Sequence, residues 1–546
     1  MKRLFIVIVC CVSSFMLVSS CDLAEYNPGG VTSETVFTTP EGFESLVNAA
    51  YSYSRWWYGK EEGYAAGEMG TDLWTSGAGD ENPNFTRYES LQPSANVVGV
   101  FWEQFYSAIN LCNAGINRIG ESGLSEELQT IREAELRFLR AFYYWHIVET
   151  WGGVHFTTEE TEGIQVEANR SSVDTFYDQI FADLDFAVAN LPVTSSDIGR
   201  VTKPAAEAFL ARMYLTRGMD QEAFDMADKV INDYGFGLVA NYDDLWEMDN
   251  LQNEEVIWVV NYSEDLALND QEDEILFPEG HGRGGHNGHL HFFMTYDQVD
   301  GMNRDIENGR PFNRYMPTAF LLDLFEDEHD ARYEGSFKQV WYSNAPEEVE
   351  GMAEGDTAIY ATKYEVSDAF RENAVYTIYD RSDMYAPDGS IVQRTKYPSL
   401  DKFADPIRPS VSEMRSSRDA FVIRLAEMYL IAAEAQYNMN DPATASQYIN
   451  VIRERAAKPG HEADMAVSAG DIDIDFILDE RARELAGEQL RWFDLKRTGT
   501  LLERTREHNP EAGANIQDYH VLRPIPQAQI DAVENKEEFT QNEGYQ

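Results

Sequence analysis

The 546-residue sequence carries 95 Asp and Glu residues against 43 Lys and Arg residues, a formal net charge of −52. This charge argues against a nucleic-acid-binding protein, because such proteins hold phosphates with basic side chains. It also argues against basic docking onto anionic lipid headgroups. Apolar residues make up 43% of the chain and aromatic residues 12%, which is typical of an ordered globular protein with a sizeable core.

The beginning of the chain predicts a lipoprotein signal peptide over residues 1–20. Lys2 and Arg3 precede an apolar run, Leu4–Val18, which is shorter than the ~20 residues that a membrane-spanning helix needs. Small residues follow, and they end at Cys21. We expect this thiol to be the acylated first residue of a membrane-tethered mature protein, since a buried acyl chain contributes ~0.8 kcal/mol per CH₂. An ordinary cleavage site beside a cysteine is the alternative.

The remaining cysteines leave no pair for a disulfide. Cys10 and Cys11 belong to the signal peptide, so Cys112 is the single unmodified thiol of the mature chain. A secreted chain without disulfides depends on its hydrophobic core. Cys112 shares a helical spacing with Phe105 and Ile109, and we therefore expect it to be a small buried hydrophobe.

Residues 21–235 form a region with a helical period. The clearest helix is predicted over residues 126–150, with Ser125 as its N-cap and Gly152 at its end. Its apolar side chains follow one face: Leu128, Ile131, Leu136, Leu139, Tyr143 and Ile147.

Two segments repeat the small-and-large spacing of tetratricopeptide helix pairs. The first contains Ala211, Tyr214, Ala223, Ala227 and Val230, and the second contains Ala433, Ala445, Ile449 and Ile452, with Gln436 in place of the tyrosine. Small residues let antiparallel helices approach, and such pairs bury their faces only against neighbouring pairs. The sequence therefore predicts a mainly α-helical, stacked scaffold.

Residues 236–415 lack the helical period of the preceding region. Gly- and Pro-rich stretches alternate with short strand-like runs such as residues 254–262. We expect a loop-rich insert that carries specificity, because long loops in a compact chain are usually functional. Residues 416–546 return to helix and end in an irregular tail.

Four of the ten histidines lie within one Gly-rich stretch of this insert, residues 281–293, at His281, His286, His289 and His291. On a strand, the last two would share a side, and paired imidazoles can bind zinc. No cysteine or clear carboxylate ligand stands beside them, and the glycines around them indicate a flexible loop. We therefore expect no metal and no cofactor.

The stretch GEQLRWFDLKR resembles an active site because Glu488, Arg491, Asp494 and Arg497 recur at helical spacing. Residues at this spacing touch on a helix, so an ion-paired structural face is the simpler interpretation. The sequence also lacks a G-x-S-x-G elbow, an H-E-x-x-H motif and a phosphate-binding glycine loop. We expect a binding protein that is not an enzyme.

Five motifs in chain order resemble the SusD/RagB family. They are the lipobox at Cys21, residues 140–153, residues 424–429, residues 480–497, and the ending with residues 523–526 before residues 541–545. The resemblance implies a surface-exposed outer-membrane lipoprotein of Bacteroidota, built on tetratricopeptide-like helices with an irregular insert. It further implies that the protein binds glycans, or peptides in some members, and acts as a lid on a SusC-like TonB-dependent transporter.

A glycan site needs exposed aromatic platforms beside polar side chains, each stack contributing ~1 kcal/mol by analogy with aromatic pairs. Aromatic residues in polar, Gly-rich loops are the candidates. The first predicted group is Trp74 and Tyr88 with Asp72, Asn84 and Arg87. The second group is Tyr315 with Asn313 and Arg314, followed by Trp341 and Tyr342. The alternative is that these rings pack beneath the loops. The segment Trp56–Tyr58 is a weaker rival patch.

The sequence thus predicts a cell-surface lipoprotein that captures oligosaccharides or polysaccharides and delivers them to a SusC-like transporter. A peptide-binding RagB-like lid is the alternative within the family. An extracytoplasmic glycoside hydrolase is the third hypothesis.

Overall fold

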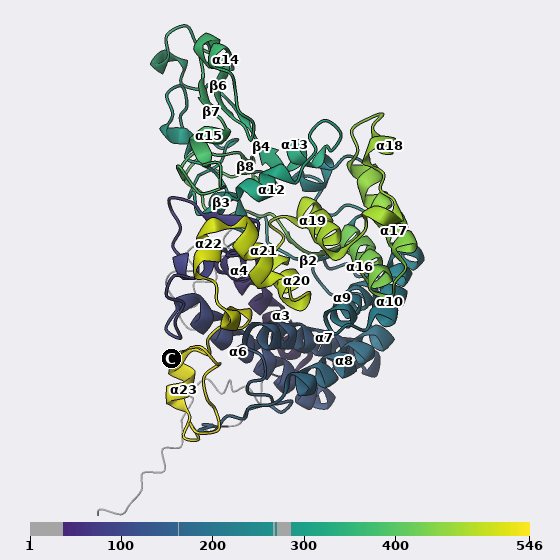
Figure 1. Ribbon diagram of the computed structural model, residues 1–546. Helices are drawn as coiled ribbons and strands as arrows, with labels where there is room; N and C mark the ends of the chain where they lie inside the picture. The colour runs from purple at the N-terminus through teal and green to yellow at the C-terminus, as the bar shows by residue number, and fades with distance from the viewer. Residues whose placement is uncertain (1–36, 162, 266–267, 270–284, 546) are drawn as a thin grey trace, which may run out of the picture.

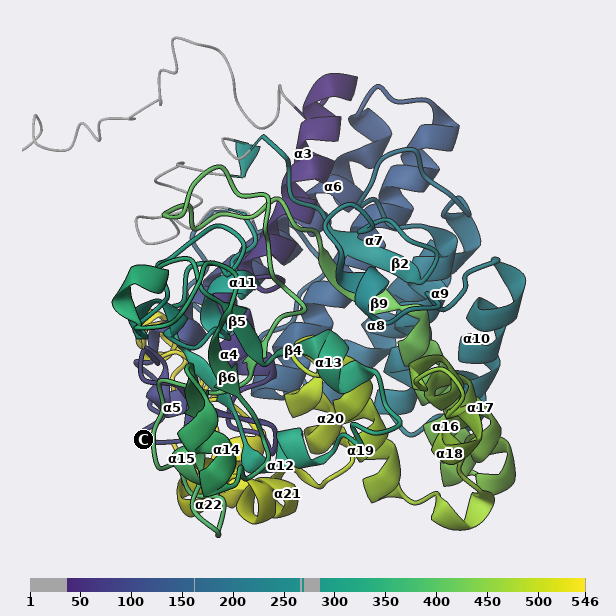
Figure 2. The ribbon, with the colours of Figure 1, turned by 90° about the horizontal axis from the view of Figure 1, so that it is seen from above.

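The computed structural model describes residues 37–161, 163–265, 268–269 and 285–545. The expected fold class is confirmed: the protein is mainly helical with a few short strands. In Figures 1 and 2 a curved stack of helices occupies one side of the molecule, and the insert lies on the other.

The first helical region ends at Asp233. Its helices are α3 Pro40–Ser52, α4 Glu61–Gly67, α5 Pro83–Thr86, α6 Asn96–Arg118, α7 Glu126–Trp151, α8 Val173–Asn190, α9 Lys203–Thr216 and α10 Asp220–Asp233. The last helical region begins at Leu425. Its helices are α16 Leu425–Asn438, α17 Pro442–Ala456, α18 Glu462–Met465, α19 Ile474–Leu485, α20 Arg491–Arg497, α21 Leu501–His508, α22 Pro510–Asn515 and α23 Gln527–Ala532.

Helix α7 forms where its sequence predicts. The Ser125 hydroxyl accepts a hydrogen bond from the Leu128 amide at 3.3 Å, which caps the N-terminus. Gly152 follows the last turn with φ of 72°, a conformation that a side chain would oppose. Because the C-terminal half of α7 is buried on all sides, it forms the centre of the larger hydrophobic core.

The predicted tetratricopeptide-like pairs are the antiparallel helices α9 with α10 and α16 with α17. Helix α10 also packs against α16, which joins the two pairs into one stack although about 200 residues separate them. Ala211, Ala223, Ala227 and Ala433 are completely buried where the helices meet. Cys112 on α6 is also buried, as expected, and burial raises the pKa of its thiol.

The insert contains short helices as well as the expected loops and strands. Its helices are α11 Gly288–His291, α12 Ala319–Asp323, α13 Arg332–Ser336, α14 Asp368–Asn373 and α15 Arg381–Met384. The strands of the molecule are β1 Trp74–Ser76, β2 Val256–Val260, β3 Tyr315–Pro317, β4 Phe337–Lys338, β5 Val340–Tyr342, β6 Thr357–Ala361, β7 Thr377–Tyr379, β8 Ser399–Leu400 and β9 Ala420–Arg424.

These strands form four small sheets. The antiparallel pairs are β1–β3, β2–β9 and β4–β8, and the fourth sheet has the order β5–β6–β7, with β6 and β7 parallel. We call residues 337–392, which include this sheet with α14 and α15, the projecting lobe, because they extend away from the helical stack at the upper left of Figure 1.

A buried ionic network holds the insert against the helical stack. Glu484 on α19 accepts hydrogen bonds from Arg332 of the insert at 3.0 Å and from Arg424 at 2.7 Å, and it also pairs with Arg455. Arg332 itself is fully buried and further pairs with Asp330 at 2.8 Å. This network stabilises the observed contact between the insert and the stack, because each buried charge left without a partner would lower the free energy of unfolding by several kcal/mol.

Among the described residues, no helix combines the length and apolar character needed to cross a membrane. The predicted signal peptide and Cys21 lie outside the described residues.

Candidate ligand-binding surface

The β1–β3 ladder brings the two predicted groups of ligand-binding residues together. Trp74 lies opposite Pro317, and Ser76 lies opposite Tyr315, although more than 200 residues separate the strands. Arg314 extends this connection, because its guanidinium lies 3.0 Å from Glu61 and also contacts Glu81 and the Gly79 carbonyl. The first group and half of the second therefore share one neighbourhood.

Most of the predicted aromatic platforms are buried, contrary to the expectation that their rings are exposed. Trp74 and Tyr315 have no exposed surface, and Trp341 is 2% exposed. The Trp74 ring packs edge-on against Phe292 at 4.7 Å, in the second hydrophobic core. These three rings lie under the loops, as the alternative interpretation holds, and none of them presents a face to a sugar.

Tyr88 is buried for a different reason. Its backbone is in the left-handed region, with φ of 54°, and its ring stacks on His520 of the C-terminal segment at 4.7 Å. It is 3% exposed, so it is also excluded as a platform. Its neighbours Asn84 and Arg87 are half-buried, and Arg87 lies 3.3 Å from Glu89.

Asp72 is an internal ion-pair partner. Its carboxylate accepts hydrogen bonds from Arg491 at 2.6 and 2.8 Å and from Arg504 at 2.9 Å. Burial alone would raise the pKa of Asp72, but the two guanidiniums outweigh it and hold the pKa at about 2. The prediction that Asp72 contacts ligand is therefore wrong: its oxygens are already occupied inside the protein.

The polar partners of the second group are likewise occupied. Asn313 is 1% exposed, and its side-chain oxygen accepts a hydrogen bond from the Ala78 amide at 2.6 Å. Arg314, 9% exposed, forms the ion pairs described above. Both residues shape the loop at residues 77–82, and they leave little polar surface for a ligand.

Tyr342 is the predicted aromatic residue that the structure leaves exposed, at 59%. It ends β5 in the projecting lobe, and the turn after it is tied to the loop at residues 301–308. Asn344 donates to the Asn303 carbonyl at 2.9 Å and to Asp305 at 2.6 Å. The exposed ring thus lies two residues before Asn344, whose amide is fixed by a backbone carbonyl and a carboxylate.

Two further exposed rings of the insert were not predicted. Tyr364 is 53% exposed and Phe370, on α14, is 46% exposed. The signal was present in the sequence, since both lie in a polar stretch rich in aromatic residues. Tyr364 donates its hydroxyl hydrogen to Asp327 at 3.0 Å, which fixes its polar end within the protein.

The rival patch and the histidine cluster belong to the core. Trp56, Trp57 and Tyr58 are 1–2% exposed. His289 and His291 lie on the short helix α11 and not in a loop or on a strand. They and His286 are buried, whereas His281 lies outside the described residues. Burial lowers the pKa of His286 and His289, which favours neutral rings.

The stretch at residues 487–497 is an ion-paired structural face. Asp494 pairs with Arg497 on the same helix at 2.9 Å, as the helical spacing predicts. Glu488 and Arg491 instead pair with distant segments, through Arg424 at 2.7 Å and Asp72 at 2.6 Å. Lys496, the fifth charged residue of this stretch, pairs with Glu149 at 2.8 Å, so all of its charged groups are engaged within the protein.

A cavity of about 380 Å³ opens elsewhere, between α3, the loop at residues 197–200 and β2. Its lining combines polar and apolar groups, and its arginines have partners: Arg55 donates to the Asn261 carbonyl at 2.7 Å, and Arg200 pairs with Glu135 at 2.6 Å. The recess is therefore large enough for a small molecule but is lined by groups that already satisfy one another.

Comparison with known proteins identifies the family. Residues 255–545 match the SusD family, and residues 44–215 match a family described as "Starch-binding associating with outer membrane". SusD-like protein P25 of Formosa agariphila is 29% identical over 81% of this chain and 79% of its own. Starch-binding protein SusD of Bacteroides thetaiotaomicron is 23% identical over 88% of this chain and 84% of its own.

Solved structures share the fold. A laminarin-binding SusD-like protein superposes with a TM-score of 0.69 at 23% identity, covering 92% of this chain and 99% of that one. Surface glycan-binding protein A of Bacteroides thetaiotaomicron, solved with laminarihexaose, gives a TM-score of 0.68 at 20% identity over 92% and 99% of the two chains. Since the SusD match alone spans more than half of the sequence, the chain belongs to the SusD family.

Proposed function

We propose that this protein is a lipid-anchored glycan-binding protein of the outer cell surface, and that it holds its ligand on the projecting lobe without cleaving it. The observation that carries the proposal is the exposed Tyr342 ring, two residues before Asn344 of the hydrogen-bonded Asn303–Asp305–Asn344 cluster, in a protein of the SusD family. Relatives that are named for binding starch and laminarin support glycans as the ligand class.

The chemistry of this surface suits a sugar. A flat ring offers a stacking partner for the C–H face of a pyranose, and amides and carboxylates beside it accept and donate hydrogen bonds to hydroxyls. A single exposed ring provides little buried area, so we expect modest affinity for one sugar unit and tighter binding of polymers that engage several copies at once.

Calorimetry with a panel of soluble glycans, including laminarin and starch fragments, tests the proposal. We expect saturable binding to at least one glycan, and a loss of about tenfold or more in Tyr342→Ala. Tyr364→Ala is the matched control, because that ring is similarly exposed in the same insert but has its hydroxyl bound to Asp327. If glycan binding survives Tyr342→Ala and is lost in Tyr364→Ala, the ligand does not bind at Tyr342.

Two experimental outcomes would contradict the proposed ligand class or the proposed lack of enzymatic activity. Heat from basic peptides and none from any glycan would favour the peptide-binding alternative. Release of new reducing ends from a polysaccharide incubated with the purified protein would show a hydrolase.

We further propose that the anchored protein works with a SusC-like TonB-dependent transporter, to which it passes the glycan. Family membership supports this partner. Purification of the full-length protein from detergent-solubilised outer membranes tests it. We expect such a transporter to co-purify in stoichiometric amount, and recovery of the protein alone under gentle detergent conditions would contradict a stable complex.

A further inference from the structure

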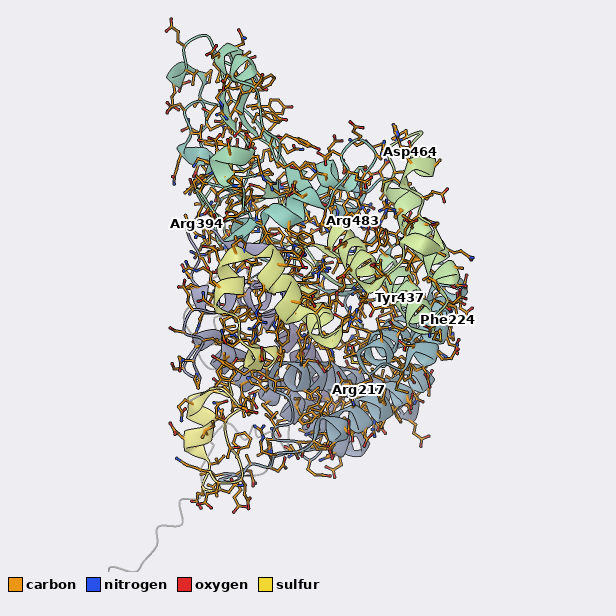
Figure 3. The ribbon with its side chains drawn as sticks, in the orientation of Figure 1. Arg217, Phe224, Arg394, Tyr437, Asp464 and Arg483 are labelled. Atoms are coloured by element: carbon orange, nitrogen blue, oxygen red, sulfur yellow. The ribbon has the colours of Figure 1, made fainter. Side chains whose placement is uncertain are left out.

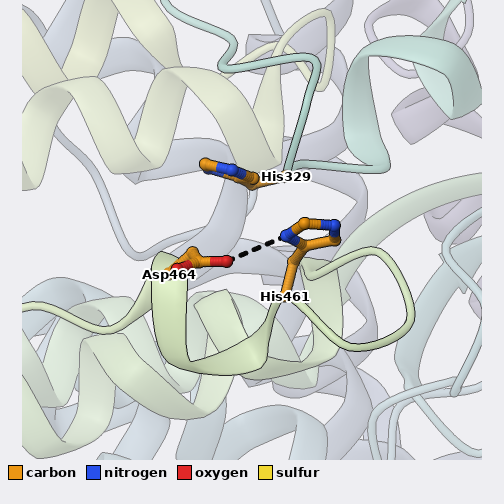
Figure 4. A group of neighbouring side chains, drawn as sticks. All are labelled: His329, His461 and Asp464. Atoms are coloured by element: carbon orange, nitrogen blue, oxygen red, sulfur yellow. Dashed lines mark hydrogen bonds and ion pairs between the residues drawn. The ribbon is translucent and has the colours of Figure 1, made fainter.

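Three potential metal ligands meet where the insert contacts the C-terminal helices. His329 lies between α12 and α13, His461 is the residue that precedes α18, and Asp464 lies on α18. Figure 4 shows the three side chains facing one another, with the His329 ring above the other two. Figure 3 places Asp464 at the opposite edge of the molecule from Arg394, which adjoins the β1–β3 neighbourhood.

The potential ligand atoms are close together. One nitrogen of each imidazole and one oxygen of Asp464 all lie within 4.8 Å of one another. His461 Nδ1 is 2.9 Å from the Asp464 carboxylate. The two imidazole rings stack with their centroids 4.8 Å apart and their planes 28° from parallel. Two imidazoles with one carboxylate form a donor set that zinc and its neighbours in the transition series prefer.

The backbone fixes the two segments against each other. The Lys458 amide donates to the His329 carbonyl at 2.7 Å, and the Ala331 amide donates to the Ala456 carbonyl at 2.8 Å. On the same turn, the His461 amide donates to the Lys458 carbonyl at 2.9 Å, and the Asp464 amide donates to the His461 carbonyl at 3.0 Å. Backbone hydrogen bonds therefore hold the three side chains near one another before any ion binds.

Both imidazoles have ring nitrogens that are available to coordinate an ion. Within the described chain, neither nitrogen of His329 takes part in a hydrogen bond, and His461 uses only Nδ1. Because His461 and Asp464 are 41% and 54% exposed, an ion has access from solvent, and water can complete its coordination. The nearby charge of Lys458 is paired with Glu334 at 2.8 Å.

We propose that His329, His461 and Asp464 form a binding site for a divalent transition-metal ion of the zinc class. Ligand atoms on one tetrahedral zinc ion lie about 3.4 Å apart. The observed spacing is up to 4.8 Å, so side-chain rotations are needed to close the site around an ion, including a turn of the stacked His329 ring. Asp464 is exposed and the two histidines are half-buried. Imidazole donors select this class over calcium, which prefers oxygen ligands.

Binding at this position would fasten the insert to the helical stack. His329 precedes Arg332 of the buried ionic network by three residues, whereas His461 and Asp464 belong to the C-terminal helices. An ion that bridges the two segments binds the folded protein more tightly than the unfolded chain. It therefore raises the free energy of unfolding as its concentration exceeds the dissociation constant.

Titration of the tag-free protein with Co²⁺ and Zn²⁺ tests the site. We expect one ion per chain, visible as the d–d absorption of Co²⁺, which Zn²⁺ displaces, together with an increase in melting temperature on adding Zn²⁺. His329→Ala, His461→Ala and Asp464→Asn should each weaken binding by more than about tenfold. These side chains are partly or fully exposed, so the variants should fold.

His508→Ala is the matched control. His508 also lies near a carboxylate, Glu507 at 3.9 Å, but its ring stacks on Phe320, and no imidazole among the described residues stacks on it. This variant should bind the ion as the parent protein does. Absence of a Co²⁺ spectrum in the parent, or one that persists unchanged in both His329→Ala and His461→Ala, would overturn the proposal.

Discussion

Trp74 packs between Phe292 and Phe337, where replacing the indole by a methyl group would leave a large apolar cavity. We predict that Trp74→Ala lowers the free energy of unfolding by about 3–5 kcal/mol. Urea denaturation followed by circular dichroism measures this loss. Tyr342→Ala should shift the same free energy by less than about 0.5 kcal/mol, because its ring is exposed. Equal effects of the two substitutions would contradict the assignment of one ring to the core and the other to the surface.

The buried carboxyl group of Glu68 makes the stability of the protein depend on pH in a way that can be tested. It is fully buried, and one of its oxygens accepts from the Leu490 amide at 3.1 Å. Burial raises its pKa to about 7, and the hydrogen bonds from the backbone only partly oppose this shift. The pKa is above the unfolded value of about 4.3, so the protonated form contributes stability at low pH that is lost as the pH rises toward 7.

Glu68→Gln removes this titration while keeping an oxygen for the Leu490 amide. We therefore predict that the free energy of unfolding of the variant, measured relative to the parent, increases by about 2 kcal/mol between pH 5 and pH 8. Urea denaturation at the two pH values gives this difference, in which the other titrating groups cancel. A difference that is constant with pH would show that Glu68 has an ordinary pKa in the folded protein.

At the scale of elements, Glu484 on α19 connects the insert to the helical stack through Arg332, Arg424 and Arg455. We predict that Glu484→Gln lowers the free energy of unfolding by about 3–5 kcal/mol, because it leaves buried guanidiniums without their shared counter-charge. Chemical denaturation measures this loss. Glu503→Gln, on the exposed face of α21, should have an effect near zero, and a similarly small effect at Glu484 would show that the network tolerates the missing charge.

The helices could be predicted from the sequence because their signals are local. Ser125, the period of residues 126–150 and Gly152 define α7 within one stretch, and the small residues of α9, α10, α16 and α17 define the pairs. The environment of Trp74 could not be predicted in this way. Its burial depends on pairing with β3 and on Phe292, both more than 200 residues away, so a Gly-rich sequence gave no indication of the core around it.

The candidate site also depends on contacts between segments that are distant in the sequence, so it could be predicted only in part. Tyr342 was one of five aromatic candidates, and what distinguishes it is the tie between Asn344 and the loop at Asn303. The His329–His461–Asp464 group was not predicted, because 132 positions separate the two histidines and the backbone pairing of Asp330 with Ala457 brings them together. Contacts between distant segments decide both sites.

At the scale of the whole molecule, the proposed function depends on where the chain is anchored. A glycan-binding surface supplies a transporter only if both are held in the same membrane, since tethering replaces diffusion from bulk by a high local concentration. The sequence predicts the anchor at Cys21, after the small residues that end the apolar run. An acyl group there contributes ~0.8 kcal/mol per buried CH₂, and stable attachment takes more than one chain.

Cys21→Ser removes the thiol that would carry these chains. We predict that the parent protein fractionates with the outer membrane and that its amino-terminal peptide has the mass of a lipidated cysteine, whereas the variant appears in the soluble fraction. Protease treatment of intact cells checks the side of the membrane, because a surface-exposed protein is degraded while a periplasmic control survives. An unmodified amino terminus in the parent would contradict lipid anchoring. A lipidated parent that resists protease on intact cells would place the glycan-binding lobe on the inner side, where it could not capture ligand from outside.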